Sequence, residues 1–135
     1  MNVDNKATAT RFLQAFGAGD AAALKTLVTA DIKVVTKGSA DISMTHDYDT
    51  IMRLCAAFPQ ITSSGGIRFE FLNLTAEDDR VAVEAKGFST EITGKQYNNE
   101  YHFLIFFRDG KVCLMHEYLD TKLADAVLGK YLTAA

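Results

Sequence analysis

Residues 97–120 read YNNEYHFLIFFRDGKVCLMHEYLD and carry a hairpin signal near their centre. Asp109-Gly110 suits a two-residue type I′ turn, because both central positions of that turn need positive φ. The flanking residues are rich in aromatic and branched side chains, as strands are. A two-residue loop pairs Arg108 with Lys111, and counting outward fixes the register of two long antiparallel strands.

This register divides the hairpin into two faces, because successive side chains of a strand point to opposite sides. It places His102 directly opposite Glu117 on one face. That face carries His102, Leu104, Phe106, Cys113, Met115 and Glu117. The other face carries Asn99, Tyr101, Phe103, Ile105, Phe107, Val112, Leu114, His116, Tyr118 and Asp120.

The preceding strand, residues 80–92, indicates which face looks inward. A second tight turn at Thr93-Gly94 sets Ala85 opposite His102, so the apolar positions 81, 83, 85 and 87 join the face of His102 and Glu117. Glu84 and Lys86 join the tyrosine face, and opposite charges in mid-strand suit solvent. We therefore expect His102 and Glu117 on the buried, concave face.

An odd-sized loop or a bulge would reverse this assignment. The alternative pocket then has Asp120 as its base and tyrosines as oxyanion donors. Its polar set is Tyr97, Asn99, Tyr101, His116, Tyr118 and Asp120.

Length and composition predict one globular domain over residues 1–135. The chain is 48% hydrophobic and 23% charged, with a net charge of −3. Without a basic run, nucleic acid and anionic membranes are unexpected partners. No apolar run reaches the ~20 residues of a membrane span, and the N-terminus lacks the apolar core of a signal peptide, so we expect a cytoplasmic protein. Cys55 and Cys113 show no metal or redox spacing and are expected to be buried free thiols.

The order of elements predicts an α+β fold. Helices are expected over residues 5–18, 21–28, 47–58 and 122–132, with Pro59 ending the third. Strands are expected over residues 32–36 and 67–75, followed by the three long strands described above. Helices on one face of a curved antiparallel sheet leave the other apolar face uncovered, so we expect a homodimer through that outer face.

Two segments carry a family resemblance. Residues 11–32, RFLQAFGAGDAAALKTLVTADI, and residues 97–124, YNNEYHFLIFFRDGKVCLMHEYLDTKLA, resemble the nuclear transport factor 2-like superfamily. Within it the chain looks like the SnoaL-like branch, which includes polyketide cyclases, ketosteroid isomerase-like proteins and limonene epoxide hydrolases. The resemblance spans nearly the whole chain. It implies a cone-shaped sheet with three helices on its concave face and a pocket at the open end.

The resemblance also carries over to single positions. Glu117 matches a position where the epoxide hydrolases hold a catalytic aspartate, and Met115 matches a pocket-lining aromatic. Ala85 and Gly87 fall where that branch places the rest of its arginine–aspartate set, and neither has a functional group. This departure argues against epoxide hydrolysis by the family mechanism.

The candidate catalytic pair is therefore His102 and Glu117. A carboxylate beside an imidazole raises the basicity of the far nitrogen, and burial raises the pKa of a glutamate toward neutrality. Such a pair suits isomerase or aldol-cyclase chemistry on a small apolar oxygenated molecule, for example a polyketide, steroid or terpenoid. The ligand-binding residues expected around it are Phe16, Tyr48, Met52, Phe58, Ala85, Leu104, Phe106 and Met115.

No metal or cofactor is expected. Three scattered histidines show no metal-binding spacing, and neither a dinucleotide-binding nor a P-loop motif is present. Two alternatives to catalysis stay open. One is a non-catalytic pocket or accessory module that binds a small apolar ligand, with His102 and Glu117 as a satisfied polar pair. The other is a dimeric structural module with a vestigial pocket.

Overall fold

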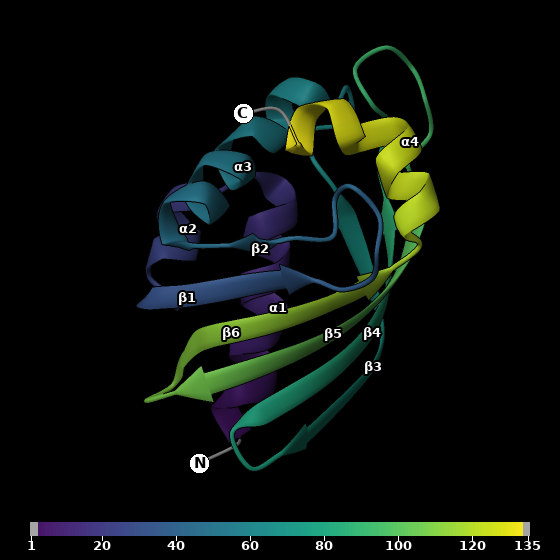
Figure 1. Cartoon of the computed structure of the whole chain (residues 1–135). Helices are drawn as coiled ribbons and strands as arrows, with labels where there is room; N and C mark the ends of the chain where they lie inside the picture. The colour runs from purple at the N-terminus through teal and green to yellow at the C-terminus, as the bar shows by residue number, and fades with distance from the viewer. Residues whose placement is uncertain (1–2, 134–135) are drawn as a thin grey trace.

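A curved six-stranded sheet forms the frame of the molecule, in a computed structural model that describes residues 3–133 (Figure 1). Its strand order is β2-β1-β6-β5-β4-β3. The strands are β1 (Val28–Thr36), β2 (Thr45–His46), β3 (Arg68–Glu77), β4 (Arg80–Phe88), β5 (Asn99–Arg108) and β6 (Lys111–Leu119). Neighbours are antiparallel except β1 and β6, which are parallel. This confirms the α+β class and the curved, largely antiparallel sheet.

Four helices gather on the concave side and at one end of the sheet (Figure 1). They are α1 (Val3–Ala18), α2 (Ala21–Lys25), α3 (Tyr48–Ile61) and α4 (Thr121–Leu132). Aspartates cap the last three, because the side chains of Asp20, Asp47 and Asp120 each accept a first-turn N–H. The predicted stop at Pro59 is wrong, since α3 continues to Ile61. No helix in the described part of the chain has the length and apolar character to span a membrane.

The loop between β4 and β5 differs from the predicted two-residue turn. The backbone N–H of Glu91 donates to the carbonyl of Lys95 at 2.8 Å, so three residues, Ile92 to Gly94, form the loop. The extra loop residue shifts the pairing by one position. Ala85 therefore lies opposite Tyr101, and not opposite His102 as expected.

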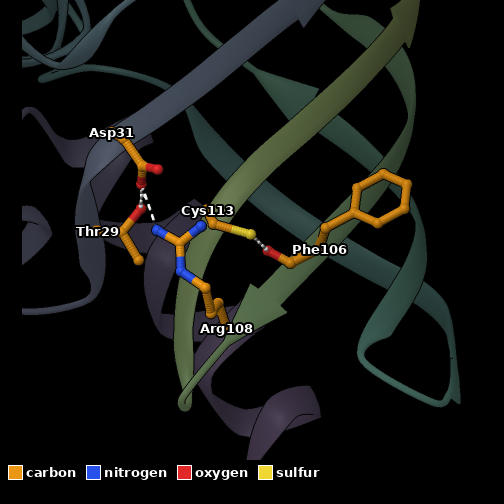
Figure 2. A network of polar contacts seen from close by, with 5 residues as sticks. All are labelled: Thr29, Asp31, Phe106, Arg108 and Cys113. Carbon is orange, nitrogen blue, oxygen red and sulfur yellow. Dashed lines mark hydrogen bonds and ion pairs between the residues drawn. The ribbon is translucent and has the colours of Figure 1, made fainter.

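The turn at Asp109-Gly110 is confirmed, and Arg108 pairs with Lys111. Both turn residues have positive φ, 53° and 78°. Beyond the turn, however, β6 contains a bulge: Phe107 pairs with Val112 and Phe106 pairs with Leu114, so Cys113 is an extra residue. The Cys113 thiol donates to the carbonyl of Phe106 at 3.5 Å (Figure 2).

These two shifts change which residues share the concave face. Phe103 lies opposite Glu117, and His102 lies opposite Tyr118. The predicted pairing of His102 with Glu117 is wrong, because His102 is exposed on the outer face. The concave face instead combines the two predicted sets: Tyr101, Phe103, Ile105, Met115 and Glu117.

The outer face is partly apolar and has no helix over it. Leu72 and Tyr118 expose 42% and 44% of their surface there. His102 and Tyr118, and likewise Phe106 and His116, form aromatic pairs on this face. The homodimer through this surface stays a prediction.

The tip of the β5–β6 hairpin is tied to β1. The Arg108 guanidinium donates to Asp31, which also accepts from the hydroxyl of Thr29 (Figure 2). Both bonds lower the pKa of Asp31. Because this ion pair is solvent-exposed, it fixes the geometry of the strand ends more than it stabilises the fold. Strands β1 and β6 terminate at the opposite end of the sheet.

Candidate functional site

A narrow cavity of about 60 Å³ lies between the concave face and helices α1, α3 and α4. It occupies the end of the sheet away from the Asp109-Gly110 turn. Its apolar lining consists of Phe16, Val34, Ile42, Ile51, Leu54, Phe58, Ile67, Phe69, Leu119, Ala124, Leu128 and Leu132. Its polar lining consists of Thr36, His46, Tyr97, Tyr101 and Glu117. Glu117 is therefore the one carboxyl group among the described residues that line this cavity.

The Cys113 bulge gives Glu117 its inward direction. Glu117 lies beside Thr36 in the parallel pairing of β1 and β6, and the Thr36 hydroxyl donates to Glu117 Oε1 at 3.0 Å. Burial raises the pKa of Glu117 to about 6, although the bond from Thr36 acts in the opposite direction. A carboxyl group with this pKa is ionised at neutral pH and is a much stronger base than an exposed glutamate.

Two tyrosine hydroxyl groups share the cavity with Glu117. Tyr101 OH donates to Tyr97 OH at 3.3 Å, and Asn99 Nδ2 donates to the same oxygen at 3.0 Å. Burial raises the pKa of Tyr97 to about 12 and that of Tyr101 well above its ordinary value. The Glu117 charge contributes to both shifts, so the carboxylate and the tyrosines share one electrostatic environment.

His46 is the remaining ionisable side chain of the lining. It lies on β2 opposite Val34, and Val34 is next to Met115 of β6. Burial lowers the pKa of His46, and the nearby Arg53 charge lowers it further while Asp47 opposes the change. The lowered pKa favours the neutral imidazole, which can donate one hydrogen bond and accept another.

The structure brings together three of the predicted site residues, since Phe16, Phe58 and Glu117 line the cavity. The others lie elsewhere. Met52, Ala85 and Met115 are buried in the main core, and Leu104 and Phe106 lie on the outer face with His102. Tyr48 lines a separate surface hollow with Asp47, Asp49 and Lys33. The expected ligand-binding roles of these displaced residues are therefore not supported by their positions.

Four polar lining residues were not in the favoured set. Tyr97 and Tyr101 belonged to the alternative pocket, whose Asp120 instead caps α4 and whose His116 and Tyr118 face outward. Thr36 was missed, and His46 was expected to be a solvated side chain near the start of the third helix. Alternation along residues 32–36 places Thr36 on the same side as Ile32 and Val34, and this signal would have found it. A two-residue strand such as β2 gives no such signal.

Helix α4 closes one side of the cavity with Ala124, Leu128 and Leu132. Its C-terminal turn is held by Glu91 in the β4–β5 loop, whose side chain has no exposed surface. The Glu91 carboxylate accepts from Tyr131 OH at 2.6 Å and from Thr93 N at 3.0 Å, and Lys130 Nζ lies at 3.7 Å. We call Glu91, Thr93, Lys130 and Tyr131 the Glu91 cluster. It fastens the cavity's covering helix to a loop of the sheet.

Replacing Glu91 with glutamine is expected to lower the melting temperature by several degrees at neutral pH. The hydrogen bonds from Thr93 and Tyr131 lower the pKa of Glu91 to about 2. A depressed carboxyl pKa gives stability that is present above the ordinary pKa of 4.5 and is lost as the pH falls through about 2. The deficit of the variant should therefore shrink on acidification. Melting temperatures of the wild type and the variant, measured from neutral pH down to about pH 2, test this pH dependence. Glu100→Gln, at an exposed position, is the control for the loss of a charge. A deficit that does not change with pH would contradict this account.

Comparison with known proteins was made for sequence and for structure. The sequence profile of the SnoaL-like domain matches residues 9–115. No curated protein sequence matches the chain. An NTF2-like protein from Burkholderia xenovorans LB400 is similar in structure, with a TM-score of 0.70 and 20% identity, covering 92% of this chain and 95% of that one.

Two further solved structures share the fold. A protein from Jannaschia sp. CCS1, named as a candidate SnoaL-like polyketide cyclase, has a TM-score of 0.72 at 17% identity and covers 98% of this chain and 93% of its own. TerC, co-crystallised with polyporic acid, has a TM-score of 0.75 at 20% identity, with coverages of 93% and 98%. At these identities the structures establish the fold alone. With the profile match over most of the sequence, the chain belongs to the SnoaL-like domain family and has the NTF2-like fold.

Proposed function

We propose that this protein catalyses cofactor-free proton transfer at a carbon next to a carbonyl group, as in an isomerase or an aldol-type cyclase. The substrate is a small apolar molecule that carries oxygen. The observation that carries the proposal is Glu117: a single carboxyl group with a pKa of about 6, inside a cavity whose other walls are mostly apolar. Glu117 alone takes the role first expected of the pair with His102.

The chemistry needs only one base. Ionised Glu117 removes a proton from the carbon next to the carbonyl, and the electron pair of the C–H bond becomes the enolate. In an isomerase the protonated Glu117 returns the proton to another carbon of the same system. In an aldol cyclisation the enolate carbon forms a bond to a second carbonyl carbon, whose oxygen then takes the proton. Neither route changes the oxidation state of the substrate as a whole.

The similar proteins support the substrate class. The Jannaschia protein is named as a candidate polyketide cyclase, and TerC was crystallised with polyporic acid. Both names fit an oxygenated, largely apolar ligand. The lining of this cavity favours the same kind of molecule, because its polar groups are few and are grouped around Glu117.

The size of the cavity supports a second candidate function. About 60 Å³ is well below the roughly 300–1,000 Å³ of typical ligand sites. A ligand that contains even one six-membered ring must therefore displace lining side chains or α4, because an apolar cavity that holds benzene measures about 150 Å³. A protein that binds such a ligand without turnover would have the same apolar lining and would not need the high pKa of Glu117.

Isomerisation of cyclohex-3-enone tests the proposal, because the conjugated product absorbs in the ultraviolet. We expect a protein-dependent rate that rises with pH through about 6, as Glu117 ionises. The rate should fall to near the buffer background in Glu117→Gln. Exchange of the α-protons of 2-tetralone in D₂O, followed by NMR, supplies a second probe. Binding of both probes without exchange would favour the ligand-binding module, and an unchanged rate in Glu117→Gln would overturn the role of Glu117.

A further inference from the structure

We infer that the outer face of the sheet carries a second binding site, where Arg68 holds the carboxylate or phosphate group of a small ligand. The site goes beyond the proposed function, because it lies outside the cavity and does not involve Glu117. Arg68 is the first residue of β3 and pairs with Phe88, the last residue of β4. Phe69, the next residue of β3, lines the cavity, so alternation turns Arg68 to the opposite face.

An open hollow of about 320 Å³ lies against Arg68. Its volume is within the roughly 300–1,000 Å³ of typical ligand sites, whereas the inner cavity has about 60 Å³. The ring of Phe88 and five side chains with hydroxyl or amide groups complete its lining. An adjoining hollow of about 260 Å³ shares Ser64 and Arg68 with it. Among the described residues, Arg68 is the only charged side chain that lines either hollow.

The Arg68 guanidinium is held in place but has no acidic partner. Its Cζ lies 4.7 Å from the centre of the Phe88 ring, which is a cation–π contact. None of the ion pairs within residues 3–133 involves Arg68. Glu70, which is two residues further along the same face, lies opposite Lys86 instead. The guanidinium therefore keeps its N–H donors for a ligand, and the contact with Phe88 reduces the rotamer freedom that binding would remove.

A chain of amide hydrogen bonds in the same hollow ends on a second free donor. The backbone N–H of Ser89 donates to Asn98 Oδ1 at 3.4 Å, and Asn98 Nδ2 donates to Gln96 Oε1 at 3.3 Å. The Ser89 N–H thus orients the amide of Asn98, and Asn98 orients the amide of Gln96. Gln96 Nε2 is left with no acceptor in the part of the chain that the structure describes. The hollow therefore presents the Gln96 amide N–H groups together with the guanidinium.

The hydroxyl groups of the lining hold the floor of the hollow together. Those of Ser64 and Ser89 both donate to the carbonyl of Gly66, at 3.1 and 2.8 Å. The backbone N–H of Thr90 donates to Ser64 Oγ at 3.0 Å. These bonds join the loop before β3 to the segment after β4, so the walls are fixed in the absence of a ligand. The two serine protons are used in this way, which leaves Arg68 and Gln96 to contact a ligand.

The free polar groups determine the class of ligand. Arg68 and the Gln96 amide nitrogen can only donate hydrogen bonds, so they suit a group that only accepts them. The hydroxyl groups of a sugar or another neutral polyol would bring further donors that need acceptors. An ionised carboxylate or phosphate has acceptors alone, and its oxygens match the planar fork of a guanidinium. A small molecule with one such group is therefore the expected ligand.

Titration with inorganic phosphate and with acetate, at constant ionic strength, tests the site. In ¹H–¹⁵N NMR spectra, the Arg68 Nε–H and the Gln96 side-chain amide should shift together and saturate with at least one of the anions. Arg68→Gln should weaken this binding by about 10- to 100-fold, the effect of losing hydrogen bonds to a charged group. Arg53→Gln is the matched control and should bind like the wild type, because Arg53 is exposed on α3 and lines neither hollow.

Arg68→Lys separates the fork from the charge. It keeps the positive charge but loses the paired N–H groups, so the affinity should fall by at least about 3-fold. Because Arg68 is exposed, neither substitution should unfold the protein. Saturable binding of phosphate alone would identify the ligand as a phosphate ester, and binding of acetate alone would identify it as a carboxylic acid; both results support the site.

Three results would overturn the inference: shifts that do not saturate, an affinity of Arg68→Gln or Arg68→Lys equal to that of the wild type, and the absence of anion binding by the wild type. A partner copy that covered Arg68 in solution would give the last of these. Failure of the proposed function has a different signature, since Glu117→Gln should bind the anions with unchanged affinity. The isomerisation test and the anion titration can therefore each fail without the other.

Discussion

Glu117→Gln is expected to slow proton transfer from a ketone probe by roughly 10²- to 10⁴-fold, the usual contribution of a positioned general base. The same change is expected to stabilise the folded protein at neutral pH. Both effects have one cause, because the apolar cavity that makes Glu117 a stronger base also disfavours its charge. Glutamine keeps the shape of the side chain and the acceptor for Thr36 but has no charge to bury.

The pH dependence of this gain has a definite sign. Folding raises the pKa of Glu117 from 4.5 to about 6. A raised carboxyl pKa means that its contribution to stability is intact below about pH 4.5 and is lost as the pH rises through about 6. The variant should therefore match the wild type at about pH 4 and exceed it by up to about 2 kcal/mol at about pH 8.

Urea unfolding at these two pH values measures the gain. Thr36→Val is the complementary variant: it keeps the carboxyl group and removes the hydroxyl that stabilises its charge, so it should lose stability as the pH rises. Equal stabilities of Glu117→Gln and the wild type at about pH 8 would show that the carboxylate is not strained by its surroundings.

The second large effect is expected at Gly66, in the loop that joins α3 to β3. Gly66→Ala should destabilise the protein by more than about 4 kcal/mol, a size that marks a specific structural failure. A Cβ atom at this position would lie 2.1 Å from the backbone carbonyl oxygen of Gly17 in α1. The positive φ of Gly66, 105°, adds backbone strain for any residue with a side chain.

The neighbouring backbone has no room to move away. The N–H of Ile67 donates to the same Gly17 carbonyl at 2.7 Å, and the N–H of Gly66 donates to Thr62 Oγ1 at 2.7 Å. These bonds also place Ile67, which lines the cavity, so a partly folded variant should lose ligand binding as well.

Gly65→Ala is a close control, because Gly65 also has a positive φ, 82°, but its Cβ would meet nothing within 4 Å. Gly65→Ala should lower the free energy of unfolding by about 1–3 kcal/mol, which is the cost of the backbone strain alone. Denaturant unfolding of both variants measures their losses of stability, and the difference between the two is the cost of the steric clash at position 66. Equal losses at the two positions would mean that the contact between the loop and α1 is not tight.

Features that depend on a few adjacent residues were predictable from the sequence. The Asp109-Gly110 turn and the capping aspartates Asp20 and Asp120 follow from local backbone chemistry, and the structure has each of them. The helix and strand order, and with it the fold class, follows from the apolar period of each segment. The position of the pocket, between the sheet and the first and third helices, came from the family resemblance.

The sheet face on which each side chain lies depends on two one-residue changes of strand register, and no sequence pattern indicates either of them. The β4–β5 loop has three residues in place of two, and Cys113 adds one residue to β6. Each shift reverses the face assignment of everything beyond it. Glu117 lies beyond both, so the two reversals cancel and it faces inward as predicted. His102 lies beyond only the first, so it faces outward.

No burial signal could have corrected this error. Leu104 and Phe106 on the outer face are as apolar as Phe103 and Ile105 on the inner face, so both assignments bury a hydrophobic strand. The packing of α4 over the cavity could not be predicted from the sequence either. Its position over the cavity depends on Glu91, which meets Tyr131 across 40 positions of sequence.

The bulge at Cys113 decides which side chains of β6 reach the cavity. If β6 kept Cys113 but paired with β5 without interruption, Glu117 would lie opposite His102 and face solvent. His116 and Tyr118 would then bring an imidazole and a phenol to the concave face. Deleting Cys113 would have no such effect, because Glu117 would stay opposite Phe103. A slip of β6 by one residue can thus exchange the reactive group of the scaffold without any change in sequence, whereas a point substitution can remove Glu117 but cannot invert the strand.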